Sequence, residues 1–197
     1  DRYQSCHRQY SLGVPFTERF FELAVQPDGL GRPAGYVGMI TANSFMKREF
    51  GKKVIEKLIP TWDLTHVVDT SGAYIPGHGT PTVILLGRHQ RPVQPTIRTV
   101  MGIRGEPSTP ADPAKGLVWT AIVDQLNEPG SESDFISVAD TDRTRFATHP
   151  WSIGGGGAAE LKDRLEAAAG ARLSAHAAVT GAVALTRDDD VFHSGRF

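Results

Sequence analysis

Residues 71–81, SGAYIPGHGTP, form a loop whose side chains are suited to contact a ligand. Glycines flank His78 on both sides, prolines stiffen the backbone at positions 76 and 81, and Tyr74 supplies an aromatic ring. The imidazole of His78 can contact a phosphate or a base edge, although an ordinary exposed loop histidine also fits the pattern. Because expected strands flank this loop, it is placed to reach over the mouth of a pocket.

Basic side chains follow the loop, with no acidic residue between positions 86 and 105. They are Arg88, Arg91, Arg98 and Arg104. Such a segment can lie along the phosphates of a nucleic acid. It can equally be a solvated face of the protein, and the sequence leaves both interpretations open. Arg88 and Arg91, together with His78, are the candidate nucleic-acid contacts.

Other reactive residues do not form a motif. Cys6 and His7 are adjacent, and adjacent residues rarely meet as a nucleophile and its base, which favours an ordinary thiol. The three acids at positions 188–190 lack the spaced ligands of a calcium loop, and no zinc-binding spacing of His and Cys occurs. The run at 153–157, IGGGG, lacks the Lys and Ser or Thr of a phosphate-binding loop. It is interpreted as a hinge or as the approach to a helix at residues 158–169.

Hydrophobic periodicity predicts the elements that position the loop. Phe16, Phe20, Leu23 and Ala24 share one stripe of a helix, and polar residues including Glu18 occupy its other positions. A second helix is expected at residues 45–59, with Asn43 or Ser44 as its cap. Short apolar runs predict strands at 36–40, 64–68 and 82–86, and a further helix and strand are expected at 118–126 and 135–138.

Strands that alternate with helices indicate an α/β fold with a mostly parallel sheet covered on both faces. The strands at 64–68 and 82–86 have no helix between them, so they can form an antiparallel pair at the edge of a mixed sheet.

Composition places the chain among packed globular proteins. Its 197 residues are 40% hydrophobic with a net charge of −1, which disfavours a disordered or strongly basic chain. No apolar run approaches the roughly 20 residues that cross a bilayer, and no secretory signal is visible. A single cysteine excludes an internal disulfide framework and suits a reducing compartment, so the cytoplasm is the expected location.

Residues 10–88 resemble the N6-adenine DNA methyltransferases, which take their methyl group from S-adenosylmethionine. That family has a helix with the pattern F-x-E-[KR], a Pro/Gly turn and an apolar strand, which stand here as FTER at 16–19, QPDG at 26–29 and GYVGMI at 35–40. Four longer segments resemble the large adenine methyltransferases of type 2 bacteriophage-exclusion (BREX) systems. They are GYVGMITANSFMKREFGKK, DTSGAYIPGHGTPTVILLGR, MGIRGEPSTPADPAKGLVWTAI and HPWSIGGGGAAELK.

The resemblance implies roles for particular residues. Phe16 corresponds to the aromatic residue that packs against the adenine of the methyl donor, although the register can shift to Phe20 and Phe16 can instead be core. Thr41 and Asn43 stand where the family lines the floor of that pocket, and Asn43 fits a helix cap equally well. Tyr74 corresponds to the ring that stacks on an adenine flipped out of the duplex, an interaction worth roughly 1–3 kcal/mol. Tyr74 as an ordinary residue packed within the loop fits as well.

The resemblance also implies a division of the chain. Residues 1–105 are expected to be the second half of a Rossmann-like methyltransferase domain with a mixed sheet. Residues 106–150 are expected to be a family-specific extension, and residues 151–197 a helical linker that opens a target-recognition region. The Gly-rich donor-binding motif and the Asn/Asp-Pro-Pro-aromatic motif of the family do not occur in these 197 residues. The isolated chain is therefore expected to be inactive.

The expected partners are double-stranded DNA and other phage-defence proteins. Two other functions stay open on the sequence alone. The chain can be a module that binds DNA or a partner without catalysis, or part of a methyltransferase that acts on RNA or protein.

Overall fold

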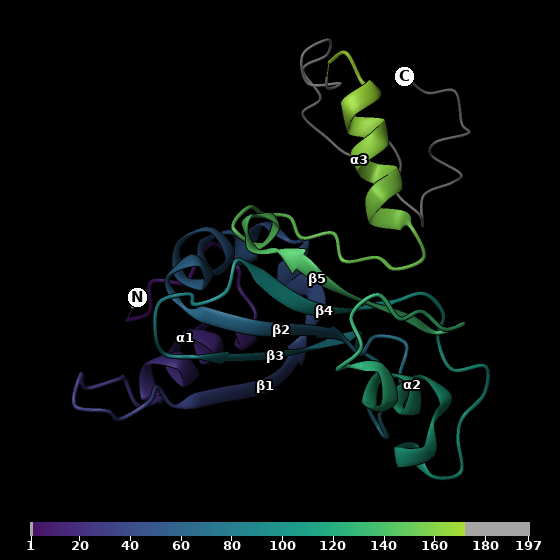
Figure 1. Cartoon of the computed structure of the whole chain (residues 1–197), viewed down its shortest axis with the longest axis horizontal. Helices are drawn as coiled ribbons and strands as arrows, with labels where there is room; N and C mark the ends of the chain where they lie inside the picture. The colour runs from purple at the N-terminus through teal and green to yellow at the C-terminus, as the bar shows by residue number, and fades with distance from the viewer. Residues whose placement is uncertain (1, 172–197) are drawn as a thin grey trace. The chain divides into compact units, whose positions relative to one another are not determined.

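Five strands form one mixed sheet in the computed structural model, which describes residues 2–171 (Figure 1). The strands are β1 (Tyr36–Ala42), β2 (Asp63–Asp69), β3 (Thr82–Arg88), β4 (Thr96–Gly102) and β5 (Ile136–Asp142), in the order β1-β3-β2-β4-β5. Only the neighbours β2 and β4 are parallel, and the other pairs are antiparallel. The predicted α/β class and mixed sheet are confirmed, whereas the expectation of a mostly parallel sheet is wrong.

The position of β3 explains this difference. The connection from β2 to β3 contains no helix, so β3 returns antiparallel beside β2 and pairs with β1 on its other side. The predicted antiparallel pair therefore exists, but it does not lie at the edge, because β1 and β5 are the two edge strands. Strand β4, which lies within the basic segment, was not predicted from the sequence.

Strand directions divide the sheet into two ends. Strands β1, β2 and β4 run in the same direction, so their last residues, Ala42, Asp69 and Gly102, lie at one end of the sheet, here named the carboxyl edge. Strands β3 and β5 run the other way and finish at Arg88 and Asp142, at the end here named the amino edge. In open α/β sheets, ligands bind outside the carboxyl ends of the strands.

Apolar clusters cover both faces of the sheet, as expected from the sequence. Val67 belongs to the larger cluster and Val68 to the smaller one, and adjacent strand residues point to opposite faces. Helix α1 (Gly13–Leu23) contributes Val14 and Phe21 to the larger cluster, and helix α2 (Leu117–Gln125) contributes Ile122 to the smaller one.

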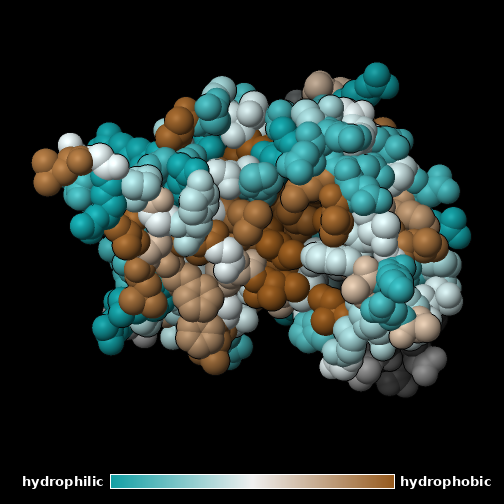
Figure 2. Space-filling model, turned by 60° about the horizontal axis from the view of Figure 1, so that its bottom comes forward, coloured by the Kyte–Doolittle hydropathy of each residue, from teal (hydrophilic) through white to brown (hydrophobic). Residues whose placement is uncertain are grey.

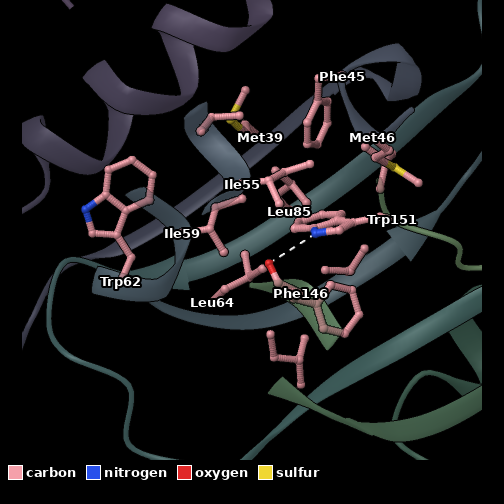
Figure 3. Packing of buried hydrophobic residues seen from close by; sticks show 14 of the residues in the cluster. Met39, Phe45, Met46, Ile55, Ile59, Trp62, Leu64, Leu85, Phe146 and Trp151 are labelled. Carbon is pink, nitrogen blue, oxygen red and sulfur yellow. Dashed lines mark hydrogen bonds between the residues drawn. The ribbon is translucent and has the colours of Figure 1, made fainter. Parts of the chain in front are cut away.

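Trp151 anchors the larger cluster (Figure 3). Its side chain is 2% exposed, its ring lies edge-on to those of Phe45 and Phe146, and its indole N–H donates to the carbonyl of Phe146 at 3.1 Å. Its main-chain N–H donates to the carbonyl of Met46 at 2.8 Å. Trp151 therefore fixes the end of the described core to the helical turns that follow β1.

Helix α1 buries a different face from the one expected. Thr17, Glu18 and Phe21 are buried, whereas Phe16 and Phe20 are 53% and 43% exposed. The alternative that Phe16 is a core residue is not supported among the described residues, because its side chain is exposed. A polar contact explains which face of α1 is buried. The carboxylate of Glu18 accepts hydrogen bonds from the main-chain N–H groups of residues 4 and 5 at 3.0 and 2.8 Å, so the face that carries Glu18 turns inward.

The expected helix at residues 45–59 is replaced by a chain of short turns. These are 3-10 turns at Asn43–Met46, Glu49–Gly51 and Ile59–Thr61, and a π-helical turn at Val54–Leu58. A Cβ atom at Gly51 would lie 1.8 Å from the carbonyl oxygen of Phe45, so the chain folds back too tightly for a regular helix. Neither Asn43 nor Ser44 caps a helix here, because the first turn has no side-chain cap.

The carboxyl-terminal part of the described chain contains helix α3 (Ala158–Ala168), which confirms the expected helix. The chain divides into compact units of Asp1–Ala159 and Glu160–Phe197. Gly155 is packed against the sheet, since a Cβ there would lie 2.8 Å from the carbonyl oxygen of Met101 and 2.9 Å from Oγ of Ser137. Strand β5, from the expected extension 106–150, belongs to the same sheet as β1–β4. The three-part division of the chain stays a prediction.

Candidate functional site

The start of α1 meets the end of β1 at the carboxyl edge. A Cβ atom at Gly13 would lie 2.4 Å from Oγ1 of Thr41, so glycine lets these two elements touch. The hydroxyl of Thr17 donates to the carbonyl of Gly13 at 2.7 Å, which ties the first turn of the helix. Phe16 belongs to the same turn, and its ring is stacked with that of Phe20, with 6.2 Å between centroids. The aromatic ring of Phe16 is thus open to contact.

Asn43 joins this end of β1 to the loop. Its main-chain N–H donates to the carbonyl of Pro81 at 3.0 Å, and its side chain is half-buried. The loop at 70–81 is closed at its base by Thr70 and Thr82, whose hydroxyl groups lie 2.8 Å apart. The structure therefore brings Phe16, Thr41, Asn43 and the loop to the same edge of the sheet.

A tight turn shapes the tip of the loop. The N–H of His78 donates to the carbonyl of Ile75 at 3.1 Å, and Gly77 between them has a φ of 67°, which favours glycine. His78 is exposed, whereas Tyr74 is half-buried. The two candidate ligand-contacting side chains of the loop thus have different surroundings.

Tyr74 lines a shallow groove of about 410 Å³. One wall comes from the start of the loop after β2, and the other comes from the segment that follows β4. The lining residues are Ser71, Gly72, Ala73, Tyr74, Gly105, Glu106, Ser108 and Thr109. Sequence reasoning missed the second wall, because it had not identified β4, whose end brings that segment to the carboxyl edge.

The arginines do not form one basic face. Arg88 ends β3 at the amino edge, where its guanidinium lies 4.2 Å from the centroid of the Tyr36 ring and hydrogen-bonds the Tyr36 hydroxyl. Arg91 lines a separate hollow of about 600 Å³ near Trp62. Arg98 pairs with the carboxylate of Asp140 at 2.6 Å. Contact of Arg88 and Arg91 with DNA stays a prediction, and the structure does not bring them to the edge that carries Tyr74.

A buried ion pair also lies at the amino edge. Asp63 and Arg143, whose side chains are 6% and 16% exposed, are 3.3 Å apart, and Asp63 also accepts hydrogen bonds from Gln90 and the N–H of Val93. Burial lowers the pKa of Arg143, and the Asp63 carboxylate opposes that effect. This pair connects β2 to the end of β5, so its role is structural.

His66 of β2 is half-buried next to charged groups. Burial lowers the pKa of His66 below its usual value, and the positive charge of Arg98 lowers it further. His66 lies beside Arg98 on neighbouring strands of the sheet, away from the loop.

Neither a metal cluster nor a membrane-spanning helix is found in the part of the chain that the structure describes. Among residues 2–171, no three His, Cys, Asp or Glu side chains gather as a metal site, and no helix is long and apolar enough to cross a bilayer. Cys6 is buried as a free thiol. The acids at 188–190 lie outside the described residues.

No protein-family model matches the chain, but it is similar to a solved structure and to a protein of known sequence. Among solved structures, the chain is similar to a modification subunit assigned to a type I restriction enzyme from Vibrio vulnificus YJ016. The TM-score is 0.45 at 13% identity, over 64% of this chain and 27% of that one. A TM-score this low is too slight to establish a shared fold.

The sequence comparison is much stronger. The chain is 52% identical over 175 residues to the adenine-specific methyltransferase PglX of Streptomyces coelicolor (strain ATCC BAA-471 / A3(2) / M145). The match covers 87% of this chain and 14% of that protein, so the chain spans a small part of its relative's length. This identity confirms the resemblance that the sequence motifs indicated. Over the 175 matched residues, the chain is therefore homologous to a segment of an adenine-specific methyltransferase of the PglX type.

Proposed function

We propose that the chain is part of an adenine-specific DNA methyltransferase of a phage-defence system, acting in the cytoplasm on double-stranded DNA. The observation that carries the proposal is the 52% identity to PglX over 87% of the chain. The whole enzyme would transfer a methyl group from S-adenosylmethionine to N6 of adenine, and other phage-defence proteins would be its partners.

The surface of α1 and β1 supports the proposal that this chain is one half of a catalytic domain. Phe16, Phe20 and Leu23 of α1, and Tyr36 and Ile40 of β1, are all at least 43% exposed. In Figure 2, which brings the lower side of the view in Figure 1 forward, apolar side chains gather on the left and near the centre of this face, among hydrophilic residues. Strand β1 also lies at an open edge of the sheet. An open edge strand beside exposed aromatic rings is a surface that a further part of a larger domain would cover.

The carboxyl edge offers chemistry that fits the methyl donor. The exposed ring of Phe16 suits stacking on a flat adenine, Thr41 near the end of β1 approaches Gly13 of the same helix, and Asn43 follows the strand. S-adenosylmethionine would supply an electrophilic methyl group when bound. Tyr74, on the loop after β2, would hold the target base by stacking, so that its amino group is oriented toward the donor.

The test is identification of the product. The full-length protein would be expressed and incubated with labelled S-adenosylmethionine and duplex DNA, and the nucleosides would be analysed by mass spectrometry. The proposal predicts label on N6 of adenine. Label on RNA or protein instead, from a folded protein that binds the donor, would contradict it, and so would donor binding without transfer to any substrate.

A further inference from the structure

The groove beside Tyr74 has a second wall that the sequence motifs do not include. Strands β2 and β4 are parallel neighbours, so the segments that leave them at the carboxyl edge emerge side by side. The first segment carries Tyr74, and the second contains residues 103–116. A groove of about 410 Å³ between them is within the range of roughly 300–1,000 Å³ typical of small-ligand sites.

The two walls are fastened together by main-chain contacts. The N–H of Glu106 donates to the carbonyl of Gly72 at 2.9 Å. A Cβ atom at Gly72 would lie 3.1 Å from Cα of Gly105 and 3.2 Å from the carbonyl oxygen of Arg104. Glycine at position 72 therefore lets the two segments touch, and the width of the groove is fixed by this contact.

Helix α2 holds the second wall in place. The carboxylate of Glu106 accepts a hydrogen bond from the N–H of Val118, in the first turn of the helix, at 2.7 Å. The buried Val118 and Ile122 of this helix belong to the apolar cluster on the sheet. The wall is thus positioned by a packed helix, and the hydroxyl groups of Ser108 and Thr109 are presented on its exposed part.

We propose that residues 105–109 are the second wall of the nucleotide-binding groove. Tyr74 stacks on an adenine base, and the hydroxyl groups of Ser108 and Thr109 hydrogen-bond the sugar-phosphate backbone beside that base. Glu106 is a positioning residue, because it acts through the main chain and α2. The inference rests on the proposed function, since it assumes that the loop after β2 receives an adenine from DNA.

The experiment is an NMR titration of the 197-residue chain, labelled with nitrogen-15, with a short single-stranded deoxyadenylate oligonucleotide, which presents adenine bases without a duplex to open. The expected result is a set of amide shifts on both walls, at residues 72–74 and 105–109. Replacing Ser108 and Thr109 together by Ala should weaken binding about two- to tenfold per lost hydrogen bond. Gly72→Ala should also weaken binding, because the walls must separate, and Gly79→Ala, in open space on the same loop, is its matched control.

The outcomes separate the inference from the proposed function. Shifts confined to residues 71–78, with unchanged affinity in the Ser108 and Thr109 double variant, would overturn the second wall while leaving the adenine-binding loop intact. Absence of binding to either wall would also overturn the inference about the second wall. If the full-length enzyme still methylated adenine in that case, the proposed function would stand without this inference. The dispersion of the spectrum shows whether the double variant is folded. A folded double variant that binds the oligonucleotide normally would also count against the inference.

Discussion

Glu18 offers a sharp test of how the motif helix is anchored. The sequence pattern FTER places this acid among the polar positions of α1, but the structure buries it to 4% exposure. Its two carboxylate oxygens accept hydrogen bonds from the N–H groups of Gln4 and Ser5. Glu18→Gln keeps one acceptor and turns an amide NH₂ group toward the other N–H group. A hydrogen bond to a charged group is worth about 1.5–3 kcal/mol, so the free energy of unfolding should fall by about that amount.

The matched control for this change lies on the same helix. Glu22→Gln removes an exposed ion pair with Arg19, whose atoms are 3.2 Å apart, and exposed pairs contribute about 0–1 kcal/mol. Urea unfolding followed by circular dichroism would measure both variants. Equal losses in the two variants, or a loss below about 0.5 kcal/mol for Glu18→Gln, would refute the assignment of Glu18 as the anchor of the amino-terminal segment.

Three further predictions concern stability. Gly51→Ala should prevent native packing of the turns after β1, because its Cβ would lie 1.8 Å from a main-chain oxygen. Gly79→Ala should be tolerated, because nothing lies within 4 Å of the Cβ it would add. Thermal unfolding of both variants would show the contrast, and similar midpoints would contradict it. Arg143→Met should lower the free energy of unfolding by about 3 kcal/mol, because it leaves Asp63 buried without its charge partner, and adding Asp63→Asn should recover part of that loss. Urea unfolding of the two single variants and the double variant would measure the coupling, and strictly additive losses would refute it. Burial lowers the pKa of His66, so below the ordinary histidine pKa of about 6.5 the unfolded state binds more protons than the folded state, and the free energy of unfolding should fall as the pH falls. His66→Gln should reduce this loss of stability between pH 7 and pH 5 in unfolding curves. An unchanged loss would contradict the assignment.

Strand positions were predictable because each strand has a short apolar run with clear boundaries. The runs predicted at 36–40, 64–68 and 82–86 correspond to β1, β2 and β3, which are each slightly longer. Strand β4 was missed because Arg98 and two threonines interrupt its apolar character. Its content of Ile, Val and Thr was a signal of strand structure that could have been used.

Helix faces were less predictable, because periodicity shows only that a stripe is apolar and not what covers it. The phenylalanines at 16 and 20 form such a stripe, yet the described core packs against the other side of α1 through Phe21. The turns after β1 bury Met46, Val54 and Ile55, but the close approach at Gly51 prevents the regular helix that was expected there. That approach depends on tertiary packing, which no local pattern reveals.

The candidate site was partly visible in the sequence. The resemblance placed Phe16, Thr41 with Asn43, and Tyr74 in three separate segments, and the fold brings those segments to one edge of the sheet. Nothing in the sequence indicated that residues 105–109 would face Tyr74, because that contact depends on the pairing of β2 with β4.

The most direct test of the central claim is a steady-state kinetic comparison of the full-length enzyme with its Phe16→Ala and Tyr74→Ala variants. The account places the methyl donor against Phe16 and the target base against Tyr74, both at the carboxyl edge. Phe16→Ala should therefore raise the KM for S-adenosylmethionine about two- to tenfold, because one aromatic stacking contact is lost. Tyr74→Ala should instead weaken use of DNA, with little change in the KM for the donor. Unchanged kinetics in both variants, or the same loss for both substrates in each, would contradict the claim that these two rings divide the donor and the base between them.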